Sequence, residues 1–270
     1  MEPSAGGARS LVVVKLGGSL LTRKREVEKL RPKVLHRLAE ELAETRPGPL
    51  LVLHGAGSFG HPSAARFGLA RPPTGSVSDR ARGAAIVAAE VRRLHLAVLR
   101  QLVDAGAAPW SVPVANLARN HAGAFGALDT QPFAAALARG LLPVAFGDVV
   151  PDDAWGVSIL SADALAVELA RRLAARRVVF ATDVPGLLHG APGGRRTVVP
   201  EVTEAAVASL RDVPGATDVT GGIRAKLEAM LTIARDGADA ALISGLTGGA
   251  VSRAVRGEPV YGSWAHARTP

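Results

Sequence analysis

Short apolar runs alternate with helical patterns along this 270-residue chain. The runs, each rich in Val, Leu and Ala, cover residues 11–16, 50–53, 141–146, 178–181 and 238–243. Amphipathic patterns separate them, the longest over residues 78–103. Short, fully apolar strands that alternate with helices are typical of parallel sheets whose two faces are both covered. The sequence therefore predicts an α/β fold with a mainly parallel central sheet.

Other stretches fit this pattern less clearly. Residues 27–44 predict a helix, because leucines and valines recur along one side of it. Residues 110–130 mix proline, glycine and polar residues, and we expect loops with one short strand there. With neither an internal repeat nor a long linker, residues 1–270 are expected to form a single domain.

One glycine-rich turn follows the apolar run that begins at Leu50. Gly55, Gly57 and Gly60 lead into a helical segment expected to begin near Pro62. A strand that runs through such a loop into a helix presents free backbone N–H groups to an anion, and His61 would add a cation. These glycines also match the dinucleotide pattern GxGxxG, but Asp79 is badly placed to hold a ribose. A tight turn without a ligand is the remaining alternative.

Three glycine-bearing turns each carry a lysine or a histidine. They lie at residues 15–19, 55–61 and 221–226. The carboxyl ends of parallel strands share one edge of a sheet, so the first two turns should meet there. Lys15 lies in an apolar strand and must point toward an anion, either a ligand or an aspartate of the protein. Such converging cations suit phosphoryl transfer, which requires charge neutralisation and in-line positioning.

Composition narrows the classes of partner. The net charge of +8 suits small anionic substrates, whereas the 4% of aromatic residues are too scattered to favour nucleic-acid binding. The absence of cysteine excludes disulfides and thiolate metal sites. No apolar stretch is long enough to span a membrane, and residues 1–10 lack a signal-peptide layout, so a cytoplasmic location without membrane contact is expected.

Five motifs in this order resemble the amino acid kinase superfamily. They are Val14-Lys15-Leu16-Gly17-Gly18-Ser19, His54-Gly55-Ala56-Gly57-Ser58-Phe59-Gly60-His61-Pro62, Gly147-Asp148-Val149-Val150, Thr182-Asp183-Val184-Pro185-Gly186 and Asp218-Val219-Thr220-Gly221-Gly222-Ile223. Together they span most of the chain. The loop that ends in Ser-Phe-Gly-His-Pro most resembles that of the isopentenyl phosphate kinases.

The resemblance implies a three-layer αβα sandwich and transfer of the ATP γ-phosphate, with Mg²⁺, to isopentenyl phosphate or a similar small alkyl monophosphate. Residues 1–150 would form the phosphate-acceptor lobe and residues 151–270 the nucleotide lobe of a homodimeric enzyme. The implied catalytic residues are Lys15, Lys24 and His61. Those implied to bind ATP are Lys15, Leu16, Gly17, Gly18, Ser19, Gly57, Asp183, Gly222 and Lys226. Those implied to bind the acceptor are Ala56, Gly60, His61 and Ser161. No protein ligand to a metal is implied.

Two departures from the family pattern leave alternatives open. Ala56 stands where a glycine is usual, and Ala162 and Ala164 stand where Gly and Asp are common, which weakens any metal role there. Asp183 is alternatively a turn residue ahead of Pro185. Within the same fold, a kinase for a phosphonate or an acidic amino acid is the nearest rival, and a regulatory module without catalysis is another.

Overall fold

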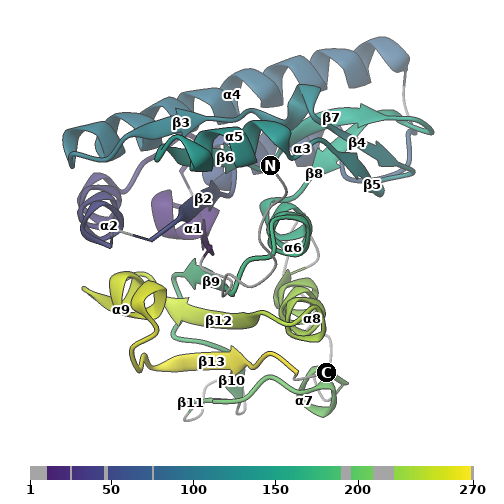
Figure 1. The fold of residues 1–270 in the computed structure, drawn as a ribbon. Helices are drawn as coiled ribbons and strands as arrows, with labels where there is room; N and C mark the ends of the chain where they lie inside the picture. Colours follow the sequence, from purple (N-terminus) through teal and green to yellow (C-terminus); the bar gives the residue numbers. More distant parts are fainter. Residues whose placement is uncertain are drawn as a thin grey trace, which may run out of the picture.

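A seven-stranded sheet forms the centre of the computed structural model, which describes residues 11–24, 26–45, 48–74, 76–189, 196–208 and 222–268. Neighbouring strands are parallel except for the last pair, β12 with β13 (Figure 1). In spatial order the strands are β13 (Gly262–Ala265), β12 (Asp239–Ser244), β9 (Arg177–Thr182), β1 (Val12–Leu16), β2 (Leu50–His54), β6 (Leu142–Phe146) and β3 (Pro109–Ser111).

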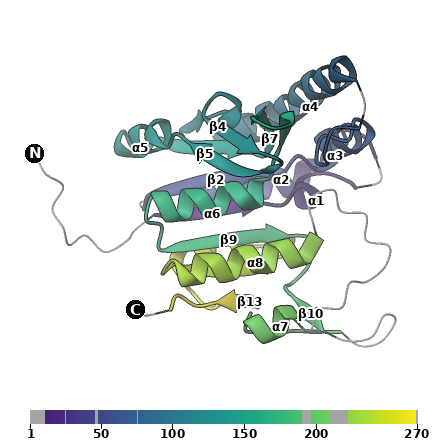
Figure 2. The same ribbon diagram turned by 90° about the vertical axis from the view of Figure 1, so that its right-hand side faces the viewer.

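Helices cover both faces of this sheet. Val12 and Val14 pack with the face that holds α2 (Pro32–Glu44), α4 (Val77–Asp104) and α9 (Ala250–Arg256). Val13, which points the other way because side chains alternate along a strand, packs with the face that holds α5 (Gln131–Ala138), α6 (Ala162–Arg172) and α8 (Gly222–Arg235). Figure 2 looks onto α6 and α8 in front of the sheet. The predicted αβα sandwich is confirmed.

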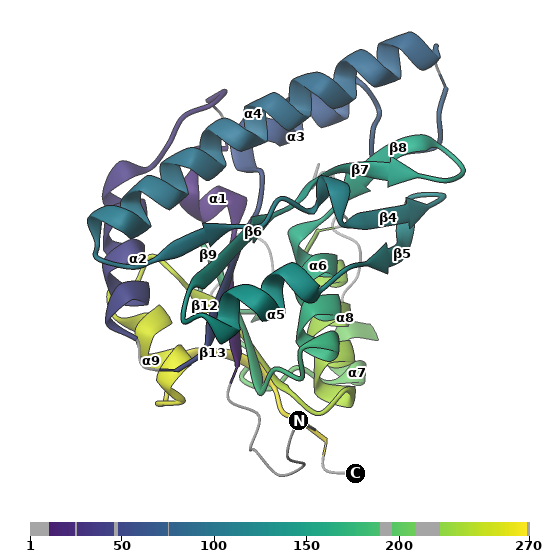
Figure 3. The ribbon, with the colours of Figure 1, turned by 45° about the horizontal axis from the view of Figure 1, so that its top comes forward.

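A second sheet lies beside the N-terminal half of α4, where Arg80 donates to the Val157 carbonyl (Figure 3). Its strands, in spatial order, are β5 (Ala124–Leu128), β4 (Ala118–His121), β7 (Asp148–Asp152) and β8 (Gly156–Leu160). The prediction of loops with one short strand at residues 110–130 is therefore wrong. These strands are short, and β4 alternates buried with exposed residues, so the continuous apolar run that marked the central strands is missing.

Two helices begin at other residues than predicted. The expected helix at residues 27–44 begins at Pro32, a residue suited to a first helical turn, and Leu30 instead forms a bridge with Thr22. Conversely, α3 (Gly57–Arg66) begins well before Pro62. The carbonyl of Ser58, which a residue other than proline at position 62 would bond, accepts from the Glu28 N–H at 3.1 Å. His61 consequently lies one turn inside the helix.

Shorter elements complete the described chain. They are α1 (Gly18–Leu21), the 3₁₀ turn η1 (Val114–Asn116), β10 (Leu188–His189), β11 (Thr197–Val198) and α7 (Glu204–Ala208). Within the described ranges, no helix combines the length and the apolar character that crossing a membrane requires.

Candidate active site

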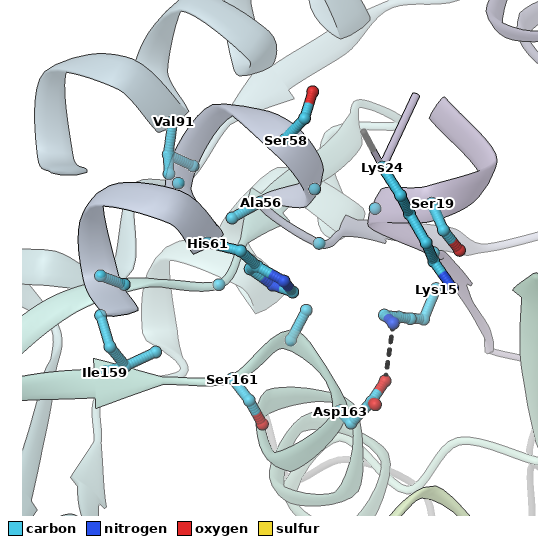
Figure 4. A pocket seen from close by; sticks show the side chains of 18 of the residues that line it. Lys15, Ser19, Lys24, Ala56, Ser58, His61, Val91, Ile159, Ser161 and Asp163 are labelled. Carbon is cyan, nitrogen blue, oxygen red and sulfur yellow. Dashed lines mark ion pairs between the residues drawn. The ribbon is translucent and has the colours of Figure 1, made fainter. Parts of the chain in front are cut away.

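A cavity of about 670 Å³ opens at the carboxyl ends of β1, β2, β6 and β9. It brings together most residues that the sequence singled out. Those on its wall are Lys15, Gly17, Gly18, Ser19, Lys24, Ala56, Gly57, Gly60, His61, Ser161, Asp183 and Lys226. In Figure 4, His61, Lys24 and Lys15 project toward the same space from three segments. The turns far apart in the sequence therefore meet at one edge of the sheet.

Two of the lysines share one aspartate. Lys15 Nζ lies 2.8 Å from Asp163 Oδ1, and Lys226 Nζ bonds the other carboxylate oxygen. This geometry follows from strand alternation, because Lys15 lies on the same face of β1 as Val13 and so points toward α6 and α8. Lys15 thus forms the ion pair that the sequence left as an alternative, and it still lines the cavity.

The charges of this cluster depend on one another. Burial alone would raise the pKa of Asp163, but the adjacent Lys15 and Lys226 outweigh burial and hold that pKa far below its usual range. The pKa of Lys226 is lowered by burial and by the nearby Lys15 charge, against the opposing effect of Asp163. Two cations and one anion leave the cluster with a net positive charge, which suits an incoming phosphate.

A second carboxylate lies at the carboxyl end of β9. Asp183, just after β9, accepts hydrogen bonds from the hydroxyls of Ser19 at 2.7 Å and Thr182 at 3.2 Å. Lys24 Nζ lies 3.9 Å from its other oxygen, and the Lys24 side chain is 71% exposed. Burial acts to raise the pKa of Asp183, but the Ser19 bond and the Lys24 charge lower it overall. Asp183 therefore ties the first glycine turn to the strand end, which is more than a turn residue ahead of proline would do.

The two glycine turns touch each other through their backbones. A side chain at Gly18 would lie 2.3 Å from the Gly57 nitrogen, and one at Gly57 would lie 2.3 Å from the Thr22 hydroxyl. Gly57 also has a φ of +53°, a conformation in which other residues are strained. The Thr22 hydroxyl donates to the Gly18 carbonyl and accepts from the Ser58 N–H. These glycines therefore permit a close approach of two loops as well as a tight turn.

Helix N-termini add partial positive charge to the same space. The start of α3, at Ala56 and Gly57, and the start of α6, at Ser161 and Ala162, both lie on the cavity wall. Ser161 is the N-cap of α6, and its hydroxyl accepts from the Ala164 N–H at 3.1 Å. The starts of two helices and the lysines thus line the same cavity.

The far end of the cavity is apolar. Its wall there comes from Ala64 on α3, Val87 and Val91 on α4, and Ile159 and Leu160 on β8. Val87 and Val91 belong to the same stretch of α4 as Gly83, and both line this space. Gly83 instead makes room for the Phe67 ring, which a side chain there would meet at 2.4 Å.

Some predicted site residues have other surroundings. The Leu16 side chain is 1% exposed and packs in the core, so only its backbone borders the turn. A side chain at Gly60 would lie 2.6 Å from Val91, so this glycine also lets α3 approach α4. Gly222 begins α8, whose Ile223 and Lys226 line the cavity. The motif residues at 218–221 lie outside the described part of the chain.

The sequence pointed to one carboxylate of this site, Asp183, and assigned no role to two others. Asp148 and Asp163 also line the cavity. Asp148 is 1% exposed, its pKa is raised by burial, and Arg92 of α4 pairs with it at 3.0 Å. In the sequence Asp163 is an ordinary acid in the first turn of a helix. Its partners are two lysines more than sixty residues away on either side, which no local pattern reveals.

Comparison with known proteins identifies a family and named relatives of this chain. Residues 10–244 match the model of the amino acid kinase family. The chain is 32% identical to an isopentenyl phosphate kinase of Methanothermobacter thermautotrophicus, over 94% of this chain and 98% of that protein. It is 39% identical to one of Haloferax volcanii, over 83% and 88%.

Solved structures agree in fold. An isopentenyl phosphate kinase crystal structure superposes with a TM-score of 0.84 at 28% identity, covering 94% of this chain and 99% of that one. The product complex of the Thermoplasma acidophilum isopentenyl phosphate kinase gives a TM-score of 0.78 at 25% identity, covering 95% and 100%.

Proposed function

The chain belongs to the amino acid kinase family, and from this premise we propose that it transfers the γ-phosphate of ATP to isopentenyl phosphate, giving isopentenyl diphosphate and ADP. One observation carries the proposal: Lys15, Lys24, His61 and Lys226 line one cavity whose opposite end is apolar. A polyanion and a small alkyl tail both find matching surroundings there. The named relatives, which share most of their length with this chain, support the same substrate.

In this proposal the protein neutralises charge and aligns the two substrates. Lys15 and Lys226, held by Asp163, bind the ATP phosphates together with the Gly17–Ser19 turn. An oxygen of the acceptor phosphate attacks the γ-phosphorus, and the bond from that phosphorus to the β,γ-bridging oxygen breaks, so that ADP leaves. Lys24 neutralises the transferring group, and His61 with the Ala56 N–H holds the acceptor phosphate. The attacking oxygen already carries negative charge, so no strong general base is required.

Mg²⁺ belongs to the proposal as a companion of ATP. The described residues contain no cluster of three or more His, Cys, Asp or Glu side chains, and both oxygens of Asp163 face lysines. This donor set fits an ion held mainly by phosphate oxygens and water, the usual coordination of Mg²⁺ at nucleotide sites. When bound, the ion would further neutralise the phosphates.

Several wider features of the protein are part of the proposal. Residues 1–150, which supply α3 and α4, form the acceptor lobe, and residues 151–270, which supply Asp183 and α8, form the nucleotide lobe. The enzyme works in the cytoplasm, where ATP is available, without nucleic-acid or membrane partners. Two copies pair through α4 and the sheet edge at β3, where Leu96, Val103 and Trp110 are exposed. Light scattering of the purified protein would test this pairing.

A panel of acceptors tests the reaction. Purified protein would be mixed with ATP, Mg²⁺ and one acceptor at a time: isopentenyl phosphate, shorter and longer alkyl monophosphates, alkyl phosphonates, glutamate and aspartate. We expect ADP release to be fastest with the five-carbon monophosphate. Faster turnover of a phosphonate or an amino acid would favour the rival kinases, and a lack of ADP release with every acceptor would indicate a regulatory module without catalysis instead.

A further inference from the structure

A buried chain of hydrogen bonds runs into the core from the turn at residues 55–61, which would hold the acceptor phosphate. His54, the last residue of β2, is fully buried, and its Nδ1 lies 3.2 Å from the Gly55 carbonyl oxygen. Its Nε2 lies 3.1 Å from Nδ1 of His95 on α4. The Nε2 of His95 lies 2.8 Å from the Ser111 hydroxyl on β3. None of these three side chains takes part in the mechanism above.

The donor and acceptor groups determine which atoms of the hydrogen-bond chain carry a proton. A carbonyl oxygen only accepts, so Nδ1 of His54 carries a proton and Nε2 must accept. His95 then donates from Nδ1, and the Ser111 hydroxyl donates to its Nε2. Burial lowers the pKa of His54 to about 4 and that of His95 to about 3. Both rings are therefore neutral near pH 7, and each neutral ring has one donor and one acceptor to satisfy.

The direction of the hydrogen-bond chain determines which way the N–H of Ala56 points. A trans peptide unit holds its C=O and its N–H on opposite sides. When the Gly55 carbonyl is drawn toward His54, the N–H of the same peptide, which belongs to Ala56, points the other way. Ala56 lines the cavity. Two backbone bonds fix the neighbouring atoms, from Gly55 N–H to the Leu16 carbonyl at 3.0 Å and from Gly147 N–H to the His54 carbonyl at 3.1 Å.

We propose that His54 is a positioning residue that aims the Ala56 N–H at the acceptor phosphate, and that His95 and Ser111 keep it in the required tautomer. The inference rests on the proposed function, because the phosphate named is that of isopentenyl phosphate. The His54 ring also stacks on the rings of His95 and Phe146, with both centroids 5.3 Å from its own. This packing leaves the His54 ring little freedom to turn over.

Two substitutions at the same position separate positioning from packing. The amide of asparagine stands where Nδ1 stands in histidine, so His54→Asn keeps a donor for the Gly55 carbonyl. The amide of glutamine stands where Nε2 stands, so His54→Gln keeps the link to His95 and loses that donor. His36→Gln, an exposed histidine of α2, serves as the matched control. Steady-state kinetics would vary isopentenyl phosphate and ATP separately, and thermal melting would check that each variant is folded.

We expect His54→Gln to lower kcat/KM for the acceptor about 10- to 100-fold, the usual cost of losing a group that orients another, with the KM for ATP unchanged. His54→Asn and His36→Gln should retain most of the acceptor kcat/KM. Equal losses in both His54 variants, or losses shared by acceptor and ATP, would overturn the proposal in favour of a packing role.

A second measurement separates this proposal from the proposed function. Wild-type protein that does not phosphorylate isopentenyl phosphate would contradict the function. The positioning chain would then be judged by ¹⁵N spectra of histidine-labelled protein. A proton on Nδ1 of His54 supports the chain, and a proton on Nε2 overturns it.

Discussion

Two lysine–aspartate clusters border the same cavity, and the lysines of one are far more buried than the lysine of the other. Asp163 bonds two lysines of which one, Lys15, has a side chain only 9% exposed. Asp183 meets one lysine, Lys24, at 3.9 Å, and that side chain is 71% exposed. The first cluster is a fixed part of the core, and the second joins a fixed carboxylate to a solvated lysine.

This difference in burial suggests that the two clusters have different roles. Cations fixed before ATP arrives need no reordering when the phosphates bind, which favours binding and alignment. In the proposed mechanism, the solvated Lys24 would follow the transferring group between donor and acceptor. On this view, removing Asp163 should affect the folded state, and removing Lys24 should affect the reaction alone.

Asp163→Asn should have the largest effect on stability. It leaves Lys15 and Lys226 without a counter-charge, and breaking a buried pair in this way costs about 3 kcal/mol or more of the free energy of unfolding. Urea unfolding at pH 7 would measure it. Asp153→Asn is the matched control, because its pair with Arg119 is exposed and should change stability by less than about 1 kcal/mol. Equal effects of the two substitutions would remove the distinction between the clusters.

The pH dependence of stability also tests the contribution of the Asp163 cluster. The pKa of Asp163 is depressed in the folded protein. Its contribution is therefore complete above its unfolded value of about 3.9 and is lost as the pH falls below it. Wild-type protein should lose more stability than Asp163→Asn between about pH 5 and pH 3. Parallel curves for the two proteins would contradict the assignment.

Lys24→Ala and His61→Ala should each lower kcat by about 10²- to 10³-fold, the typical loss for one donor in a transition state. The free energy of unfolding of Lys24→Ala should stay close to that of wild type, because the side chain is exposed. Lys33→Ala, an exposed lysine of α2, is the control. Unchanged rates in both variants would remove these residues from the mechanism.

Ile159→Ala tests the apolar end of the cavity. It removes apolar contact from the alkyl tail, so kcat/KM for isopentenyl phosphate should fall by about tenfold, within the range usual for such pockets. The KM for ATP should not change, because Ile159 lies away from the lysines. Val77→Ala, at an exposed residue, is the control. An equal effect on ATP would mean that Ile159 acts through the fold.

Ser161→Ala should have the smallest effect. Its hydroxyl caps α6, so its loss should cost about 1 kcal/mol of unfolding free energy. Ser161 was also proposed to bind the acceptor. A rise in the KM for isopentenyl phosphate beyond the change in stability would support that role, and an unchanged KM would leave the cap as its function.

Much of the central sheet was predictable, because its strands are continuous apolar runs and its helices are amphipathic. The small sheet was not. Asn120 of β4 and Asp152 of β7 are paired across a wide gap in sequence, and neither strand has an apolar run. The start of α3 was misplaced because Pro62 resembles a helix start, whereas Glu28 satisfies the carbonyl that the proline leaves free.

In the candidate site, too, only the features with a local sequence pattern were predictable. Lys15 and the glycine turns carry local patterns, so the sequence could assign them to one edge of the sheet. The pairing of Asp163 with Lys226 and the chain from His54 to Ser111 depend on which face of a strand meets which helix. Such contacts join residues of ordinary local character, and only the folded arrangement reveals them.

Phosphorus NMR of one reaction mixture tests the central claim most directly. Protein, ATP, Mg²⁺ and isopentenyl phosphate would be followed over time, with Lys24→Ala in parallel. We predict that the monophosphate resonance gives way to two coupled diphosphate resonances as ADP forms, far more slowly in the variant. Accumulation of ADP with free inorganic phosphate and no coupled product would contradict transfer between two facing phosphates.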